Sequence, residues 1–160
     1  MAGFHTKTFL KHDDYMTPKY AWEHIEQYIP KDKVIWEAFM GDGNSGQYLR
    51  DLGYDVIHDN DDFFESDKGE VIISNPPFSD KNKTLTRLKL LDKPFIILLP
   101  QPAINTTAIR ELFGDTLQLI IPRKRIQFIK NGTETTNKCN FDCYYYCYKM
   151  DLPRDIIWLT

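Results

Sequence analysis

The sequence predicts an α/β fold: a mostly parallel sheet, helices on both faces and a C-terminal antiparallel hairpin. Two observations carry this prediction. Short, continuous apolar runs alternate with helical patterns along the chain, and a loop rich in glycine, acid or proline follows directly after several of these runs. Apolar strands separated by helices are typical of parallel sheets buried on both faces. Ligands of such sheets bind at the carboxyl ends of the strands, where these loops would meet.

Most elements can be placed by pattern alone. A helix is expected to begin with Thr17 as N-cap and Pro18 as its first residue, and to end at Pro30. A second, shorter helix is expected to stop near Gly53. Strands are predicted over 34–39, 55–59, 70–74, 95–100 and 117–122, with a very short one over 62–64. Helices are predicted within 79–92 and over 103–113, and the hairpin is predicted from 125–129 and 141–150.

Length and composition predict one globular domain over residues 1–160. The 160 residues suffice for a substantial core, and the chain is 42% apolar and 27% charged, as is ordinary for globular proteins. No apolar run reaches the roughly 18 residues of a membrane span. The first residues lack the apolar centre of a secretory signal. We therefore expect an intracellular, cytoplasmic protein.

Three cysteines lie near the C-terminus, at positions 139, 143 and 147. An odd number in an intracellular chain argues against a disulfide framework. The four-residue spacing admits a metal site, but neither a fourth cysteine nor a histidine lies nearby. Cys143 and Cys147 are better explained as small apolar residues on one face of a strand, so no metal is expected.

The net charge of −3 conceals two halves of opposite sign. Residues 1–70 contain 15 acidic and 7 basic residues, whereas residues 79–160 contain 8 acidic and 13 basic residues. The basic half is suited to binding phosphates. An uneven but merely solvated surface explains the charge equally well.

A glycine loop, Gly41-x-Gly43-x-x-Gly46, follows the predicted strand 34–39. Glycines there allow a tight turn and close approach of a ligand to the backbone. The spacing also fits a dinucleotide site with Asp59 on a ribose, or simply a tight strand-to-helix turn. A nicotinamide dehydrogenase would explain this glycine loop, but it would give no role to the Asn-Pro-Pro-Phe sequence at 75–78.

A second loop, Asn75-Pro76-Pro77-Phe78, follows the predicted strand 70–74. Two prolines fix the backbone and remove two donors. An Asn side-chain oxygen beside a fixed carbonyl forms a pair of acceptors suited to a planar NH2 group. Phe78 offers a ring on which a base can stack. The alternative is a rigid turn followed by a core Phe.

Together, WEAFMGDGNSG and IISNPPF resemble the class I methyltransferases that use S-adenosylmethionine (SAM) to modify amino nitrogens. The resemblance covers residues 13–100, and the segment 14–18 is similar to the one that closes over the methionine part of SAM. It implies a Rossmann-like fold, SAM as cofactor and a catalytic role for Asn75, Pro76, Pro77 and Phe78. The cofactor-binding residues that it implies are Tyr15, Thr17, Glu37, Phe39, Gly41, Gly43, Asp59, Asp62 and Phe63. Asp61 is an alternative to Asp59 for the ribose.

The favoured substrate is a nucleobase amino group, adenine N6 in DNA or RNA. The C-terminal part is loosely similar to small adenine methyltransferases of phages and large DNA viruses. A base must be flipped or single-stranded to reach such a site. Candidate nucleic-acid contacts are Lys81, Lys83, Arg123, Lys124 and Arg125, with Arg87 and Lys130 as further candidates. The cluster at 123–125 is explained equally well as a charged edge that blocks strand pairing.

Two other functions remain open. The same loop would serve a protein glutamine N5-methyltransferase, because that amide is also planar. The chain could instead be a SAM-binding, non-catalytic subunit of a larger complex. Family members that act on specific DNA sites usually carry an extra recognition domain, which we do not expect here. Without such a domain, three explanations are open for the choice of target site. The specificity for a target sequence is loose, or a second copy or helper subunit supplies it, or the substrate is a structured RNA.

Overall fold

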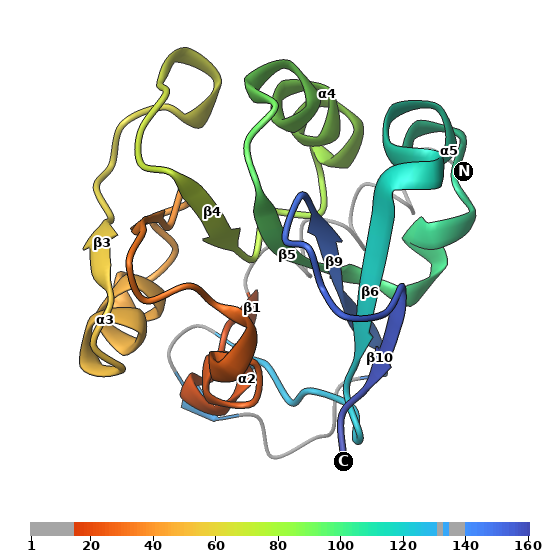
Figure 1. Cartoon of the computed structure of the whole chain (residues 1–160). Coiled ribbons are helices and arrows are strands. Elements are labelled where there is room, and N and C mark those ends of the chain that lie inside the picture. Colours follow the sequence, from red (N-terminus) through yellow and green to blue (C-terminus); the bar gives the residue numbers. More distant parts are fainter. Residues whose placement is uncertain (1–14, 131–132, 135–139) are drawn as a thin grey trace.

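The computed structural model describes residues 15–130, 133–134 and 140–160, with the side chains of 130, 133 and 134 excepted. Its centre is a seven-stranded sheet with the strand order β10-β6-β9-β5-β4-β2-β3 (Figure 1). The strands are β2 (Val34–Trp36), β3 (Asp55–Ile57), β4 (Val71–Ser74), β5 (Phe95–Pro100), β6 (Leu117–Ile121), β9 (Cys143–Tyr148) and β10 (Ile156–Trp158). All neighbours pair in parallel except β9, which runs antiparallel between β5 and β6.

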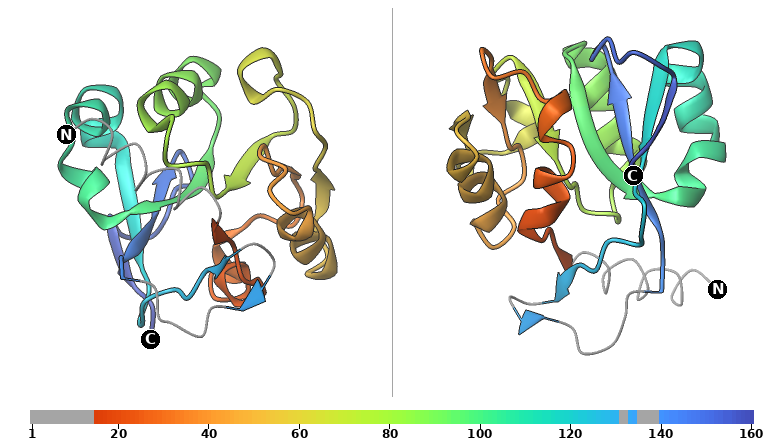
Figure 2. Two further views of the ribbon diagram at one scale, coloured as in Figure 1. Left: turned by 180° about the vertical axis from the view of Figure 1, so that it is seen from behind. Right: turned by 60° about the horizontal axis from the view of Figure 1, so that its bottom comes forward.

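Helices cover both faces of the sheet (Figures 1 and 2). On one face lie α2 (Lys19–Glu23) and α3 (Asn44–Asp51), where Trp22 and Leu49 pack in a core with Ile96. On the other lie α4 (Lys81–Leu91) and α5 (Thr107–Phe113), which form a second core with Phe95. Single 3-10 turns are η1 (Glu26–Tyr28), η2 (Phe63–Glu65), η3 (Gln101–Asn105) and η4 (Gly114–Thr116). The predicted α/β class is confirmed.

The hairpin prediction is wrong about which segments pair with the strand predicted over 141–150. The strand at 143–148 exists and is antiparallel, but it pairs with β5 and β6 rather than with 125–129. Ile126 and Phe128 are buried in the core instead. Burial between two long apolar strands satisfies both edges of β9, which a two-stranded hairpin would leave open.

Three other elements differ from prediction. The first helix is a five-residue α2 followed by η1, and Pro18 rather than Thr17 holds the N-cap position. The expected strand at 62–64 is the turn η2, because the Asp62 carboxylate accepts the Phe64 N–H and closes the chain on itself. The edge strand β10 was not predicted, since only three residues of it enter the sheet.

A separate three-stranded ribbon joins the N-terminal segment to a later one. It consists of β1 (Tyr15–Met16), β7 (Ile129–Lys130) and β8 (Thr133–Glu134) in the order β1-β7-β8. Tyr15 pairs with Lys130, and Met16 pairs with Ile129. The ribbon therefore fixes β1 to the chain that follows the basic residues 123–125.

Cys143 and Cys147 share a buried face of β9 with Tyr145, as predicted. Cys139 and Asp14 lie outside the described residues. Within the described residues, no three His, Cys, Asp or Glu side chains gather closely enough to hold a metal ion. No helix in this part of the chain has the length and apolar character to cross a membrane.

Candidate active site

The glycine loop and the Asn-Pro-Pro-Phe loop line the same cavity at the carboxyl edge of the sheet. β2 and β4 are neighbours in the parallel sheet, so the loops that follow them emerge side by side. The cavity is small, about 70 Å³. Its walls are Tyr15, Met16, Thr17, Glu37, Phe39, Met40, Gly41, Asp42, Ser45, Asn75, Pro76, Pro77 and Phe78. The structure thus brings together nine of the thirteen residues that the sequence assigned to cofactor binding or catalysis, all except Gly43, Asp59, Asp62 and Phe63.

Two glycines shape the first loop. Gly41 and Gly43 have φ values of +54° and +85°, a region that L side chains rarely adopt. Gly43 occupies the N-cap of α3. A Cβ on Gly41 would lie 3.2 Å from the Met16 Sδ atom, so β1 passes closely over this loop.

Gly46, the third glycine of the motif, serves helix packing. A Cβ at this position would lie 2.0 Å from the Nδ1 atom of His58, and Gly46 is buried. The His58 ring is held from its other side, where Nε2 lies 3.1 Å from the Phe39 carbonyl oxygen. Only a residue without a side chain allows α3 to approach His58 this closely.

A buried carboxylate joins the two loops. Glu37 is 1% exposed and accepts hydrogen bonds from the Ser45 hydroxyl at 2.5 Å, from the Ser74 hydroxyl and from the Phe39 N–H at 3.2 Å. Ser45 in turn accepts a hydrogen bond of 2.9 Å from the Trp22 indole. Burial raises the pKa of Glu37 to about 7, although these hydrogen bonds act in the opposite direction. Glu37 therefore fixes the helix start at Ser45 relative to the strand end at Ser74.

Asn75 follows Ser74 directly, so the Glu37 network positions it. Its Oδ1 atom is buried, and no other described residue donates a hydrogen bond to it. An unpaired buried oxygen costs about 1–3 kcal/mol in a folded protein. Such a group is expected where a ligand supplies the missing donor.

Aromatic side chains close one side of the cavity. Phe78 lines it but is only 5% exposed, and its ring meets Phe141 edge-on at 5.8 Å. Phe141 also contacts Tyr15 at 5.7 Å and stacks on Phe128 at the same distance. Stacking of a base on Phe78 remains a prediction, and it requires a movement that exposes more of this ring.

The acidic segment after β3 lies outside the cavity lining. The Lys68 ammonium bridges Asp59 at 2.6 Å and Asp61 at 2.5 Å, and the hydrogen bond from Lys68 lowers the pKa of Asp59. The choice between the two aspartates for a ribose therefore stays open. Asp62 is exposed and caps η2. Phe63 is buried against Phe39, with ring centroids 4.9 Å apart, so it supports the cavity wall from behind.

The basic residues fall into two groups. Near the Asn-Pro-Pro-Phe loop, Lys83 lies over the Phe64 ring, Arg87 donates to two backbone carbonyls, and burial lowers the pKa of Lys81. Arg123, Lys124 and Arg125 line a separate groove beside α2. Arg125 forms an ion pair with Asp142, with 3.0 Å between Nε and Oδ1.

Sequence reasoning missed Met16, Met40, Asp42 and Ser45 as cavity residues, and it missed Ser74 as a hydrogen-bond partner of Glu37. Both serines have a visible signal, because each lies within or immediately before a motif. Ser45 is 8 residues from Glu37 in the sequence, and Ser74 is 37 residues from it. Sequence spacing alone therefore does not reveal these two hydrogen bonds.

No protein-family model matches the chain, and no curated protein matches it either. Among solved structures, one similar chain is a Listeria monocytogenes protein proposed to be a class I SAM-dependent methyltransferase. The two superpose with a TM-score of 0.52 at 15% identity, over 91% of this chain and 65% of that one. This chain thus spans just under two thirds of the length of that protein. The similarity confirms the predicted Rossmann-like fold of the class I methyltransferase type.

Proposed function

We propose that the protein is a SAM-dependent methyltransferase that modifies the exocyclic amino group of a nucleobase, with adenine N6 as the favoured target. The observation that carries the proposal is the shared cavity, in which the buried and unpaired Oδ1 atom of Asn75 stands opposite the glycine loop. A planar NH2 group is the donor that such an oxygen accepts best. The fold of the Listeria monocytogenes protein supports the choice of SAM.

The residues present fit this cofactor in chemical character. Gly41 leaves room for a ligand to pass the loop, and Glu37 stands behind the loop as a buried carboxyl group whose pKa is raised to about 7 by burial. SAM supplies an electrophilic methyl group on a sulfonium. A cavity of about 70 Å³ is smaller than most small-molecule sites, which measure roughly 300–1,000 Å³. Binding therefore requires Tyr15 and Met16 of β1 to move away from Gly41.

The chain's own contribution to the reaction is orientation. The lone pair of an adenine amine is delocalised into the ring, which makes it a poor nucleophile. Hydrogen bonds from the amine to Asn75 Oδ1 and the Pro76 carbonyl oxygen localise that lone pair toward the methyl group. Bound SAM would supply the methyl group: the N–C bond would form as the C–S bond breaks with its electron pair on sulfur, and the amine held by Asn75 and Pro76 would lose a proton to water. Alignment of this kind supplies about 7–11 kcal/mol.

The test is the pair of variants Asn75→Ala and Asn75→Asp. We expect Asn75→Ala to bind SAM as the parent does but to lose methyl transfer, because the amine acceptor is gone. Asn75→Asp keeps an acceptor oxygen and is expected to retain measurable transfer. SAM affinity is measured by calorimetry, and transfer is measured with radiolabelled SAM on single-stranded DNA and RNA. Unchanged turnover in Asn75→Ala would remove the proposed site.

The same assay separates the other functions. Label in protein rather than in nucleic acid would favour a glutamine N5-methyltransferase. SAM binding without transfer to any pool would favour a non-catalytic subunit. We also propose that target recognition comes from a second copy or a helper subunit, which gel filtration with and without nucleic acid tests.

A further inference from the structure

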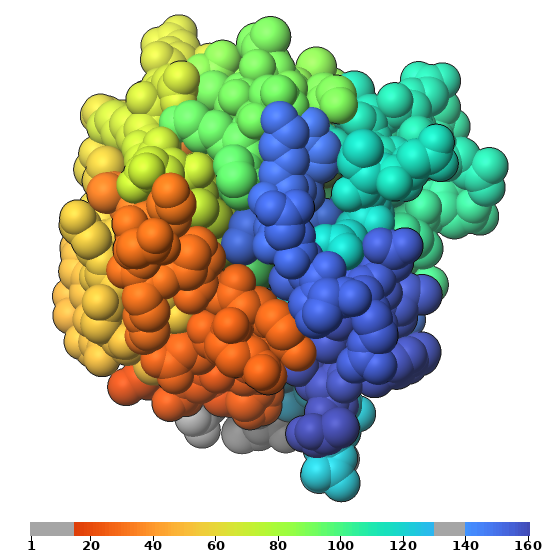
Figure 3. Space-filling model, viewed as in Figure 1, coloured from red at the N-terminus to blue at the C-terminus, as the bar shows by residue number. Residues whose placement is uncertain are grey.

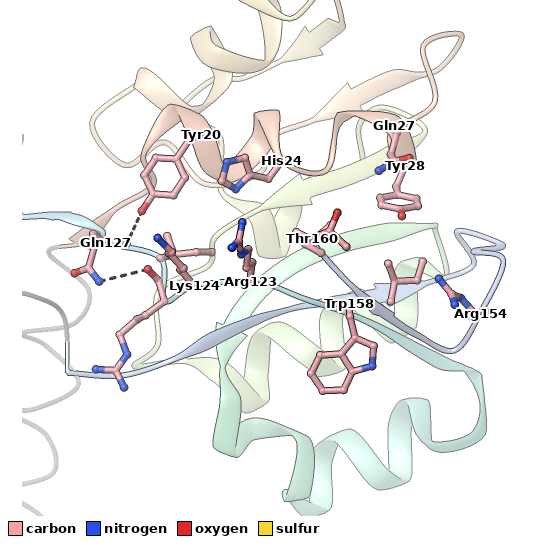
Figure 4. Close-up of a pocket in the computed structure, with 14 residues that line it drawn as sticks. Tyr20, His24, Gln27, Tyr28, Arg123, Lys124, Gln127, Arg154, Trp158 and Thr160 are labelled. Atoms are coloured by element: carbon pink, nitrogen blue, oxygen red, sulfur yellow. Dashed lines mark hydrogen bonds between the residues drawn. The ribbon is translucent and has the colours of Figure 1, made fainter.

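A large groove lies on the α2 side of the sheet, apart from the cavity. It holds about 950 Å³, which is near the upper end of the range for ligand sites. One wall is Tyr20, His24, Gln27 and Tyr28, and the other is the chain from 123 to 127 (Figure 4). Ile126, Ile157 and Leu159 give the groove an apolar base. Figure 3 shows the α2 segment and the C-terminal residues on the same face of the molecule.

The charged side chains in the groove have one sign. Arg123, Lys124, Arg125 and Arg154 line it, and no Asp or Glu is among the described residues that do so. Arg123, Lys124 and Arg154 are exposed, whereas Arg125 is occupied by Asp142. The other basic group differs, because Lys83 and Arg87 are engaged with the protein itself. The groove is therefore the better site for an anionic ligand.

The basic side chains are spread along the groove. Figure 4 shows Arg123 and Lys124 near Tyr20 and His24, and Arg154 at the opposite end beyond Tyr28. The hydrogen bonds agree: the Gln118 side-chain amide donates to the Arg154 carbonyl oxygen at 3.2 Å, which places Arg154 beside the first residues of β6. Arg123 follows the other end of β6, and the five residues of that strand span roughly 13 Å. No single phosphate reaches both ends, so the spacing suits a chain of phosphates.

The groove connects to the cavity through two short segments. Thr17 lines the cavity, and Tyr20, three residues later, lines the groove. The Tyr20 hydroxyl accepts a 2.6 Å hydrogen bond from the Gln127 N–H on the opposite wall. Beyond Gln127 the chain enters β7, which pairs with β1 above the cavity. A polymer in the groove therefore passes beside the segment that covers the reaction site.

We propose that this groove binds a single-stranded stretch of DNA or RNA next to the base that is to be methylated. Arg123, Lys124 and Arg154 contact its phosphates, while Tyr20, His24 and Tyr28 offer ring faces to its bases. Positively charged grooves with aromatic side chains bind single strands in this way. The inference rests on the proposed function, but it names a separate surface, and the residues His24, Tyr28 and Arg154 were not predicted.

The test is the double variant Lys124→Ala with Arg154→Ala. Affinity for a fluorescently labelled single-stranded 12-mer is measured by anisotropy between 50 and 200 mM salt. We expect binding to weaken about tenfold or more at 50 mM salt, and the slope of log K against log salt to become shallower by about 1.4, since two phosphate contacts are lost. Tyr28→Leu should weaken binding about fivefold with an unchanged slope, because base stacking carries no charge.

The matched control is Lys33→Ala with Arg110→Ala, which removes the same charge from exposed positions outside the groove. We expect it to retain most of the affinity of the parent. Thermal melts confirm that all variants are folded. Equal affinity and slope in the groove variant and the control overturn the proposal, as does a groove that binds only duplex or only a glutamine-containing peptide. A different outcome would refute only the proposed function: the parent transfers no methyl group to any substrate, while the groove variant still loses strand binding relative to the parent.

Discussion

The cavity and the groove are built in opposite ways. The cavity is small, and the buried Glu37 ties its two loops together through Ser45 and Ser74. The groove is more than ten times larger, and its basic side chains are exposed on the surface. Group transfer needs atoms held in one arrangement, whereas a flexible polymer needs charge spread over a path. Substitutions in the cavity should therefore affect stability and chemistry together, and those in the groove should affect binding alone.

The largest expected stability effect comes from Glu37. Its pKa is about 7 in the folded protein against 4.5 for the free side chain, so between these values the native state keeps a proton that the unfolded chain has lost. Stability must then fall as pH rises from about 4.5 to 7, by roughly 3 kcal/mol. Glu37→Gln should lack this decline, so the difference in stability between parent and variant should change by about this amount between pH 4.5 and 7. Urea unfolding at pH 4.5, 5.5 and 7 measures it, and parallel curves for the two proteins would contradict it.

Gly46→Ala is expected to cost about 2 kcal/mol or more, because the added Cβ overlaps the His58 ring. Gln47→Ala is the control, since Gln47 is an exposed residue of the same helix, and it should cost less than about 1 kcal/mol. Chemical denaturation measures both. Combining Gly46→Ala with His58→Ala should recover part of the loss. Equal costs for Gly46→Ala and Gln47→Ala would show that α3 and His58 do not depend on this close contact.

The smallest effect is expected at Arg125. Its ion pair with Asp142 is exposed, and such pairs contribute about 0–1 kcal/mol. Because Asp142 already neutralises this guanidinium, Arg125→Ala should weaken strand binding less than Arg123→Ala does. Anisotropy at a single low salt concentration compares them. A larger loss at Arg125 would mean that the strand displaces Asp142, and the path along the groove would need revision.

Sequence predicted most of the sheet because its strands are continuous apolar runs, and such runs have few alternatives to a buried position. The run 95–100 is β5 without a residue of difference. Prediction failed where partners decide the structure. The segment 125–129 has a strand-like pattern, yet Phe128 packs against Phe141 and only Ile129 enters a strand.

The candidate site divides in the same way. Asn75 and Gly41 could be predicted because each belongs to a short motif whose chemistry is local. The groove could not be predicted, since Tyr28 and Arg154 are more than a hundred residues apart and no motif includes either. Lys83 and Arg87 have the right charge for phosphates, but their contacts with Phe64 and backbone carbonyls are visible only in the fold.

The central claim is that the cavity presents an amine acceptor to a base beside a methyl donor. Incubation with methyl-tritiated SAM and separate pools of single-stranded DNA, RNA and protein tests it most directly, with nucleoside analysis of the labelled pool. We predict label in N6-methyladenine, and none when Asn75→Ala replaces the parent. Label on a ring carbon, on a ribose or on protein alone would contradict the account.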